Sequence, residues 1–203
     1  MSDVKEPIEF WFDFSSPYSY LASELIDDLA AKHGRKVKWR SMMLGAAFKA
    51  AGTQPLIAYP LKGEYSRRDF DRSARYLGVP YSFPPKFPAI TLSAARGYYW
   101  LHGRDCARAR EFAHAVFRAY WVDGRDIGEL PVVLEIAGGL GIDCDAFMAA
   151  IATPEIKERL KQETDAAIAK GMFGAPYFMV DGEPFWGADR LPQIDKWLAT
   201  GGF

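Results

Sequence analysis

The chain has 203 residues, of which 49% are hydrophobic and 25% charged, a composition typical of a globular protein with a sizeable core. Its 25 basic and 26 acidic side chains leave a net charge of −1, so the composition offers no electrostatic basis for binding nucleic acid or an acidic membrane. The first residues show no basic segment followed by an apolar one, and no apolar run reaches about 20 residues, so we expect a cytoplasmic protein without an export signal or membrane span.

The chain opens with a strand that runs into a helix. Apolar residues alternate over Ile8–Phe14, which predicts a strand, and the following Ser15-Ser16-Pro17 predicts a helix that continues over Tyr18–Lys32. Ser16 is a good N-cap and Pro17 suits the first helical position. A second strand over Arg35–Ser41 completes a parallel βαβ unit. The free N–H groups at such a helix start can hold an anion or a thiolate.

Residues 42–152 are predicted to be helical, with no strand. The predicted elements are a short helix followed by an irregular loop within Leu44–Leu61, a helix over Gly63–Leu77, an extended linker at Phe83–Pro88, and helices over Asp105–Trp121, Leu130–Ala137 and Asp143–Ala152.

Strand patterns return near the C-terminus. A helix begins after Thr153 and ends at Lys170-Gly171, and two strands, Tyr177–Val180 and Glu183–Trp186, flank the tight-turn pair Asp181-Gly182. Pro184 places the second of these strands at a sheet edge, and Asp189 is expected to cap a last helix.

Two cysteines and three scattered histidines are too few for a structural metal site, and we expect none. Cys106 lies on the apolar stripe of its predicted helix and is expected to be buried. Cys144 stands between Asp143 and Asp145, whose carboxylates oppose its ionisation, so its role is interpreted as structural.

The order βαβ, helical block, αββα, with Gly174-Ala175-Pro176 before the third strand, resembles an α/β thioredoxin-like fold with an inserted all-helical domain. Four motifs follow one another in the chain: Asp13-Phe14-Ser15-Ser16-Pro17-Tyr18-Ser19-Tyr20-Leu21, Pro60-Leu61-Lys62-Gly63-Glu64-Tyr65, Phe173-Gly174-Ala175-Pro176 and Trp186-Gly187-Ala188-Asp189-Arg190-Leu191. With these motifs the chain is similar to the 2-hydroxychromene-2-carboxylate isomerase family, in a branch shared with kappa-class glutathione transferases and disulfide oxidoreductases. The resemblance implies a discontinuous thioredoxin-like domain, residues 1–42 and 153–203, around a helical domain, residues 43–152.

The resemblance also implies a glutathione site at the start of the first helix. Redox members of the fold carry a cysteine there, whereas this chain has Ser16, which cannot form a disulfide. A serine hydroxyl can instead donate a hydrogen bond to the thiolate of bound glutathione. Ser16 can serve as N-cap and ligand contact together.

Further glutathione contacts follow from the same resemblance. Pro176 corresponds to a cis proline that leaves the backbone of Ala175 free to pair with an extended peptide, with an ordinary turn proline as the alternative. Lys62 would face the peptide carboxylate rather than be a solvated surface lysine. Asp189 would receive the γ-glutamyl ammonium group, with the N-cap role as its alternative, and Ala188 lacks the hydroxyl or amide often found there.

Three more residues are candidate substrate or ligand contacts. Thr53 stands where kappa-class members carry asparagine, and Lys49 could serve an acidic substrate. Trp186 could wall a flat aromatic substrate, or belong to the core.

The resemblance implies a homodimeric isomerase that uses glutathione on an intermediate of aromatic hydrocarbon catabolism. The alternatives are a kappa-type glutathione transferase and a redox-inactive thioredoxin-fold binding module.

Overall fold

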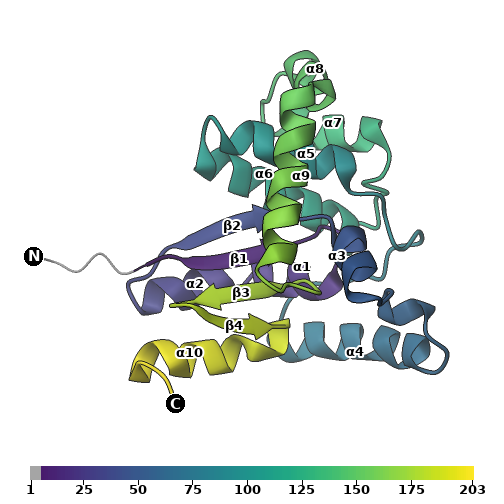
Figure 1. The fold of residues 1–203 in the computed structure, drawn as a ribbon. Coiled ribbons are helices and arrows are strands. Elements are labelled where there is room, and N and C mark those ends of the chain that lie inside the picture. The colour runs from purple at the N-terminus through teal and green to yellow at the C-terminus, as the bar shows by residue number, and fades with distance from the viewer. Residues whose placement is uncertain (1–5) are drawn as a thin grey trace, which may run out of the picture.

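The computed structural model describes residues 6–203, so the first five residues of the predicted thioredoxin-like segment lie outside the described residues. A four-stranded mixed sheet forms the centre, in the order β2-β1-β3-β4 (Figure 1). The strands are β1 (Ile8–Phe12), β2 (Val37–Ser41), β3 (Tyr177–Val180) and β4 (Glu183–Trp186). β1 pairs in parallel with β2 and antiparallel with β3, which in turn pairs antiparallel with β4.

Helices surround this sheet. They are α1 (Pro17–Ser23), α2 (Ile26–Lys32), α3 (Leu44–Ala51), α4 (Lys62–Leu77), α5 (Leu92–His102), α6 (Cys106–Trp121), α7 (Leu130–Gly139), α8 (Cys144–Ala152), α9 (Pro154–Ala169) and α10 (Leu191–Thr200), with short 3₁₀ turns η1 (Leu56–Ala58) and η2 (Ala188–Arg190). Figure 1 shows α5 to α8 gathered beyond the β2 edge, while α9 runs from them across the sheet. Across the described residues, no helix combines the length and the apolar character needed to cross a membrane.

The alternation within β1 distributes its side chains over the two sheet faces. Phe10 and Phe12 are fully buried in the main core, with Phe10 stacked on Phe178 at 5.4 Å between ring centroids and edge-on to Trp39 at 4.9 Å. Trp11 points to the other face, where it joins a smaller cluster with Ala167 of α9. Both faces are therefore covered.

Local turn signals are confirmed by the backbone. Asp181 and Gly182 have φ of 53° and 88°, as a two-residue hairpin with left-handed central positions requires. Pro184 lies in the edge strand β4, where a missing N–H disturbs no ladder on the outer side.

The single helix predicted over residues 18–32 is wrong, because the structure divides it into α1 and α2. The break follows Ser23, whose hydroxyl donates to the carbonyl of Tyr20. Glu24 then turns toward α6, where its carboxylate accepts hydrogen bonds from Arg118 and His114. Next to this contact with α6, the backbone leaves the helical region at Leu25, with φ of −124° and ψ of −26°.

Within the region predicted to be helical, no individual helix was assigned to residues 92–102, yet α5 forms there. Most of its residues are buried, so its apolar pattern lacks the one-sided stripe by which a surface helix is recognised. Gly97 permits close packing on α8, because an added Cβ would lie 2.1 Å from the Phe147 ring.

Two expectations at helix starts are also wrong. Cys106 is exposed, because it is the first residue of α6 and precedes the buried stripe that begins at Ala109. Asp189 does not cap the last helix, which starts at Leu191 after the turn η2.

Cys144 is half-buried, and its thiol donates to the carbonyl of Leu134 at 3.3 Å. The division into two domains stays a prediction. One core cluster contains side chains from both of the predicted domains.

Candidate active site

Ser16 lies where the turn after β1 becomes α1. Its N–H donates to the carbonyl of Asp13 at 3.0 Å, and its hydroxyl oxygen accepts from the N–H of Ser19 at 3.2 Å, so the predicted N-cap is confirmed. The same hydroxyl donates to the carbonyl of Ala175 at 2.8 Å. This bond joins the start of α1 to the segment before β3, which is 159 residues away in the chain.

The Ala175–Pro176 peptide bond is cis, as predicted. The carbonyl of Pro176 accepts from the N–H of Gly187 at 3.0 Å, which holds this segment against the start of η2. Gly174 leaves room for the indole of Trp186, since an added Cβ would lie 2.4 Å from its Nε1. Trp186 is 51% exposed and packs edge-on against Phe173, so it stands at the rim rather than in the core.

The carboxylate of Asp13 holds the turn between β1 and α1 in place. Its side chain is 3% exposed, and its two carboxylate oxygens accept from the N–H of Ser15 and the N–H of Leu44, both at 2.8 Å. Burial raises the pKa of this carboxyl, although these hydrogen bonds oppose the shift. One side chain therefore fixes the Ser16 turn relative to the start of α3.

Tyr18 and Asp69 connect α1 to α4. The Tyr18 hydroxyl donates to Asp69 at 2.5 Å, and its ring packs edge-on against Phe70 at 4.9 Å. Burial, and then the bond to Asp69, raises the pKa of Tyr18 well above its ordinary value, so the hydroxyl stays protonated at neutral pH. Arg72 neutralises the other side of Asp69.

The charged groups on the outer walls differ in their pairing. Asp189 in η2 is exposed and accepts a hydrogen bond from Arg190 at 2.9 Å. Lys62 begins α4, and its ammonium nitrogen lies 5.3 Å from the ring centroid of Tyr59. Among the described residues, no carboxylate pairs with Lys62.

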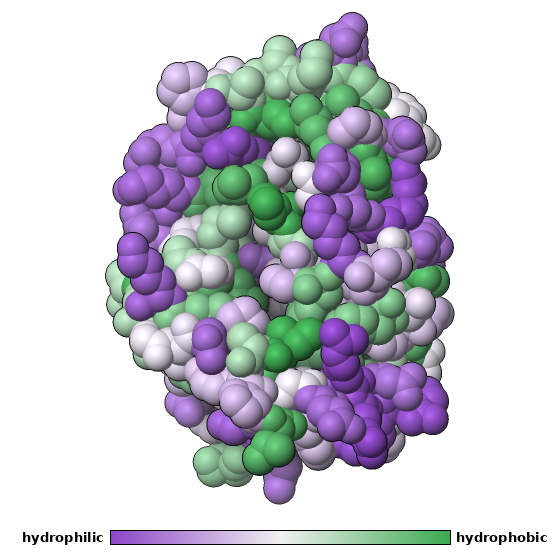
Figure 2. Space-filling model, turned by 90° about the vertical axis from the view of Figure 1, so that its right-hand side faces the viewer, coloured by the Kyte–Doolittle hydropathy of each residue, from purple (hydrophilic) through white to green (hydrophobic). Residues whose placement is uncertain are grey.

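One cavity of about 790 Å³ lies between α1, α3, α4 and the segments before β3 and η2. It includes all but one of the predicted site residues: Ser16, Thr53, Lys62, Ala175, Pro176, Trp186, Ala188 and Asp189. Lys49 is exposed on α3 and does not line the cavity. Figure 2 shows the face that carries α3 and α4, where apolar surface borders a hollow near the middle of the view.

Several lining residues were not predicted, among them Tyr18, Phe48, Asp69, Phe87 and Arg190. Tyr18 and Arg190 lie inside the motifs that carried the family resemblance, so these motifs could have identified them as site residues. Asp69 and Phe87 lie in segments without a motif, and only folding brings them to Ser16.

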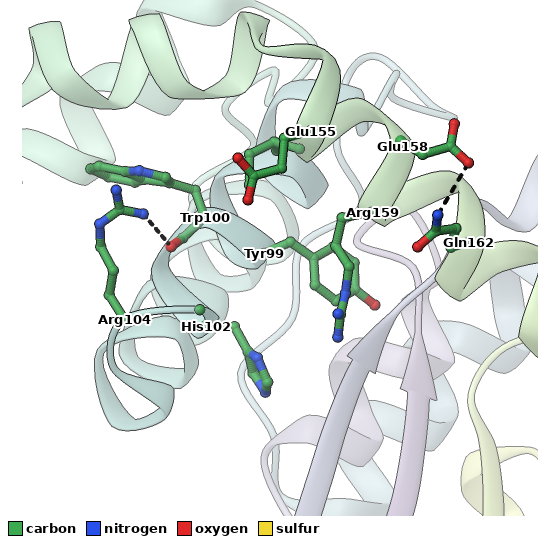
Figure 3. Close-up of a pocket in the computed structure, with 10 residues that line it drawn as sticks. Tyr99, Trp100, His102, Arg104, Glu155, Glu158, Arg159 and Gln162 are labelled. Carbon is green, nitrogen blue, oxygen red and sulfur yellow. Dashed lines mark hydrogen bonds between the residues drawn. The ribbon is translucent and has the colours of Figure 1, made fainter.

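A second, smaller cavity of about 460 Å³ lies between the end of α5 and the start of α9 (Figure 3). Arg104 lies over the indole of Trp100 and donates to its backbone carbonyl, and Gln162 donates to Glu158. Arg159 pairs with Glu163 at 2.6 Å. Within residues 6–203, His, Cys, Asp and Glu nowhere gather in a group of three or more that could hold a metal ion.

Comparisons with known proteins place the fold. A family model described as the DSBA-like thioredoxin domain matches residues 7–199. A solved structure of 2-hydroxychromene-2-carboxylate isomerase superposes with a TM-score of 0.86 at 28% identity, covering 95% of this chain and 94% of that one. The predicted α/β thioredoxin-like fold is thereby confirmed.

Sequence relatives agree with this placement. 2-Hydroxychromene-2-carboxylate isomerase of Sphingobium xenophagum is 33% identical over 200 residues, which cover 96% of this chain and 99% of the relative. The isomerase of the same name from Pseudomonas putida is 31% identical over 193 residues, covering 93% and 92%. Human glutathione S-transferase kappa 1 is 26% identical over 215 residues, covering 98% and 95%. The chain belongs to the DsbA-like thioredoxin family, in the branch that contains the 2-hydroxychromene-2-carboxylate isomerases and the kappa-class glutathione transferases.

Proposed function

We propose that this protein is a glutathione-dependent isomerase of the same reaction class as its 2-hydroxychromene-2-carboxylate isomerase relatives. The observation that carries the proposal is the position of the Ser16 hydroxyl, at a helix N-terminus, beside the backbone of Ala175 and inside the large cavity. Because serine cannot exchange disulfides, the thiol must come from a ligand. The relatives named glutathione S-transferase support a glutathione ligand.

The lining residues fit glutathione by their chemistry. Lys62 is a cation without a carboxylate partner among the described residues, which suits the glycyl carboxylate. Asp189 is an exposed carboxylate that suits the γ-glutamyl ammonium group, although it must share its charge with Arg190. The backbone of Ala175 suits pairing with the extended peptide, and Ala188 adds only backbone contacts.

When bound, glutathione supplies a thiolate that adds reversibly to a conjugated carbon–carbon double bond, which allows the substrate to isomerise. The Ser16 hydroxyl would turn from the Ala175 carbonyl to donate to that sulfur, while the α1 N-terminus favours its negative charge. A free thiol has a pKa of about 8.5, so a depression of roughly two units would ionise most of it at neutral pH.

Thr53 and Trp186 would border the substrate in this proposal. The reaction would be of the same kind as the interconversion of a 2-hydroxychromene-2-carboxylate and an open benzylidenepyruvate in aromatic hydrocarbon catabolism.

A kappa-type glutathione transferase is the second candidate, favoured by relatives such as the human protein at 26% identity over most of both chains. The two activities differ in the fate of glutathione, because conjugation consumes it and isomerisation does not.

Calorimetric titration with glutathione, followed by product analysis, tests the proposal. We expect binding at millimolar ligand and an isomerised product with glutathione unchanged. If glutathione does not bind, both enzyme hypotheses fail and the redox-inactive binding module is the remaining alternative. A glutathione conjugate as product would establish the transferase.

We further propose a homodimer, as the family resemblance implies, in the cytoplasm, as expected from the sequence pattern. Light scattering at micromolar protein concentration checks the oligomeric state, and a monomer mass would contradict it.

A further inference from the structure

Leu61, between η1 and α4, has a rare backbone conformation. Its φ of 63° and ψ of −49° are close to the values of the classic γ-turn, about 75° and about −65°. The N–H of Lys62 donates to the carbonyl of Pro60 at 2.7 Å, which is the hydrogen bond that defines such a turn. Within residues 6–203, Asp181 is the other residue with positive φ that is not glycine, and it lies in a hairpin turn that favours such angles. The turn at Leu61 is strained, because a leucine with positive φ costs free energy that glycine would not.

The side chain of Leu61 does not hold this turn, since it is 92% exposed. Backbone contacts on either side hold it instead. The N–H of Gly63 donates to the carbonyl of Tyr59 at 3.0 Å, and the N–H of Tyr65 donates to the carbonyl of Leu61 at 3.3 Å. A Cβ added to Gly63 would lie 2.6 Å from the carbonyl oxygen of Ile57, so the first turn of α4 lies directly against η1. The chain must therefore reverse direction within a few residues, and a γ-turn makes this reversal around a single residue.

The γ-turn connects two parts of the wall of the large cavity. Ile57, Tyr59 and Lys62 line the cavity, whereas Pro60 and Leu61 do not. Directly after the turn, Lys62 is the first residue of α4, and its ammonium nitrogen lies over the ring of Tyr59. The conformation of Leu61 thus sets where the lining cation without a carboxylate partner among the described residues leaves the backbone.

We infer that Leu61 is a positioning residue for glutathione: the γ-turn centred on it holds the start of α4 against η1, so that Lys62 faces the glycyl carboxylate. This inference rests on the proposed function, which assigns that carboxylate to Lys62. Leu61 acts through Lys62 and lies outside the cavity lining itself. A strained turn that its surroundings enforce preorganises the binding residue beside it, because the cost of ordering is met during folding rather than on binding.

A stability comparison tests whether the turn is strained in solution. Leu61→Gly and Leu61→Ala both remove the exposed side chain, but only glycine adopts a positive φ without steric cost. We expect the equilibrium constant of unfolding, measured by urea titration, to be about fivefold smaller for Leu61→Gly than for Leu61→Ala. At an ordinary negative φ the alanine variant would be the more stable of the two, and that order would overturn the inference.

Calorimetry with two ligands tests the link to Lys62. Leu61→Pro cannot form the γ-turn, because proline holds φ at about −65°. We expect this variant to bind glutathione about tenfold more weakly, as loss of the Lys62 contact would. The glycyl ethyl ester of glutathione lacks the carboxylate, so its affinity should be the same in the variant and in the unaltered protein. Adding Lys62→Met to Leu61→Pro should cause no further loss, because both changes remove one contact.

Three results would each overturn the inference: unchanged glutathione binding in Leu61→Pro, an equal loss for the ester, or a further loss in the double variant. If Leu61→Pro does not fold, Leu61→Gly takes its place, and its looser turn should weaken glutathione binding about threefold without affecting the ester. Failure of the unaltered protein to bind glutathione would overturn the proposed function itself, and the role inferred for Leu61 with it.

Discussion

The two cavities differ in what their polar groups do. In the larger one, the Ser16 hydroxyl is shared between a helix cap and a distant carbonyl, and Lys62 has no carboxylate partner among the described residues. In the smaller one, between α5 and α9, Arg159 pairs with Glu163, and Arg104 is held by the carbonyl and the ring of Trp100. The two arginines held in this way have less to offer an anionic ligand than an unpaired cation such as Lys62. The larger cavity, with its helix start and unpaired cation, is the better candidate for chemistry.

Removing the Ser16 hydroxyl should have the largest effect. We expect Ser16→Ala to raise the pKa of the bound thiol and slow turnover by roughly 100-fold, since a hydrogen bond to a charged group is lost. The lost cap should also lower the free energy of unfolding by about 1 kcal/mol. The pH–rate profile and the ultraviolet absorbance of the thiolate check the first effect, and urea unfolding checks the second.

Ser19→Ala is the matched control. The Ser19 hydroxyl is buried without a hydrogen-bond partner among the described residues, and only its backbone N–H contacts Ser16. Turnover and pH profile should stay unchanged. If Ser16→Ala behaves like this control, Ser16 has no part in the reaction.

Lys62 and Lys49 provide a test of the cavity boundary. Lys62→Met should weaken glutathione binding by about tenfold, because a charge-assisted hydrogen bond is lost. Lys49→Met should leave the affinity unchanged, since Lys49 lies outside the lining. Calorimetry on both variants measures the difference, and equal affinities would refute the assignment of Lys62.

Glu24 forms a cluster of paired charges with His114 and Arg118, and none of these residues lines the large cavity. Burial alone would raise the pKa of Glu24, but hydrogen bonds from His114 and Arg118 lower it below its ordinary value of 4.5. A lowered pKa in the folded state stabilises the protein above pH 4.5. This stabilisation is lost as the pH falls through the native pKa.

We therefore expect Glu24→Gln to lower the free energy of unfolding by about 1 kcal/mol at pH 7. The difference from the unaltered protein should shrink progressively below pH 4.5. Denaturation curves at a series of pH values measure it. A difference that is constant with pH would show that the Glu24 charge contributes nothing to stability.

The smallest effect is expected in the second cavity. Arg104 is exposed, so Arg104→Met should change the free energy of unfolding by less than about 0.5 kcal/mol. Glutathione affinity and turnover should not change. A loss of either would mean that the smaller cavity contributes to function and that pairing of its charges is a poor guide.

Features set by neighbours in the chain could be predicted from the sequence. The strand alternation over residues 8–12, the Ser16 cap with Pro17, and the Asp181-Gly182 hairpin all follow from local geometry and local hydrogen bonds. Because these elements come in the order of a known family, the fold and most residues of the large cavity could be named as well. Their roles toward a ligand stay predictions.

Features set by distant contacts could not be predicted. The first helix breaks at Leu25, next to a contact between Glu24 and α6 that no local pattern indicates, and α5 was missed because most of its residues are buried. Asp69 reaches the site only through the packing of α4 on α1. The local sequence determined where each strand and most helices begin. Only the tertiary structure decided which side chains share a cavity and which charges find partners, because these contacts join residues far apart in the chain.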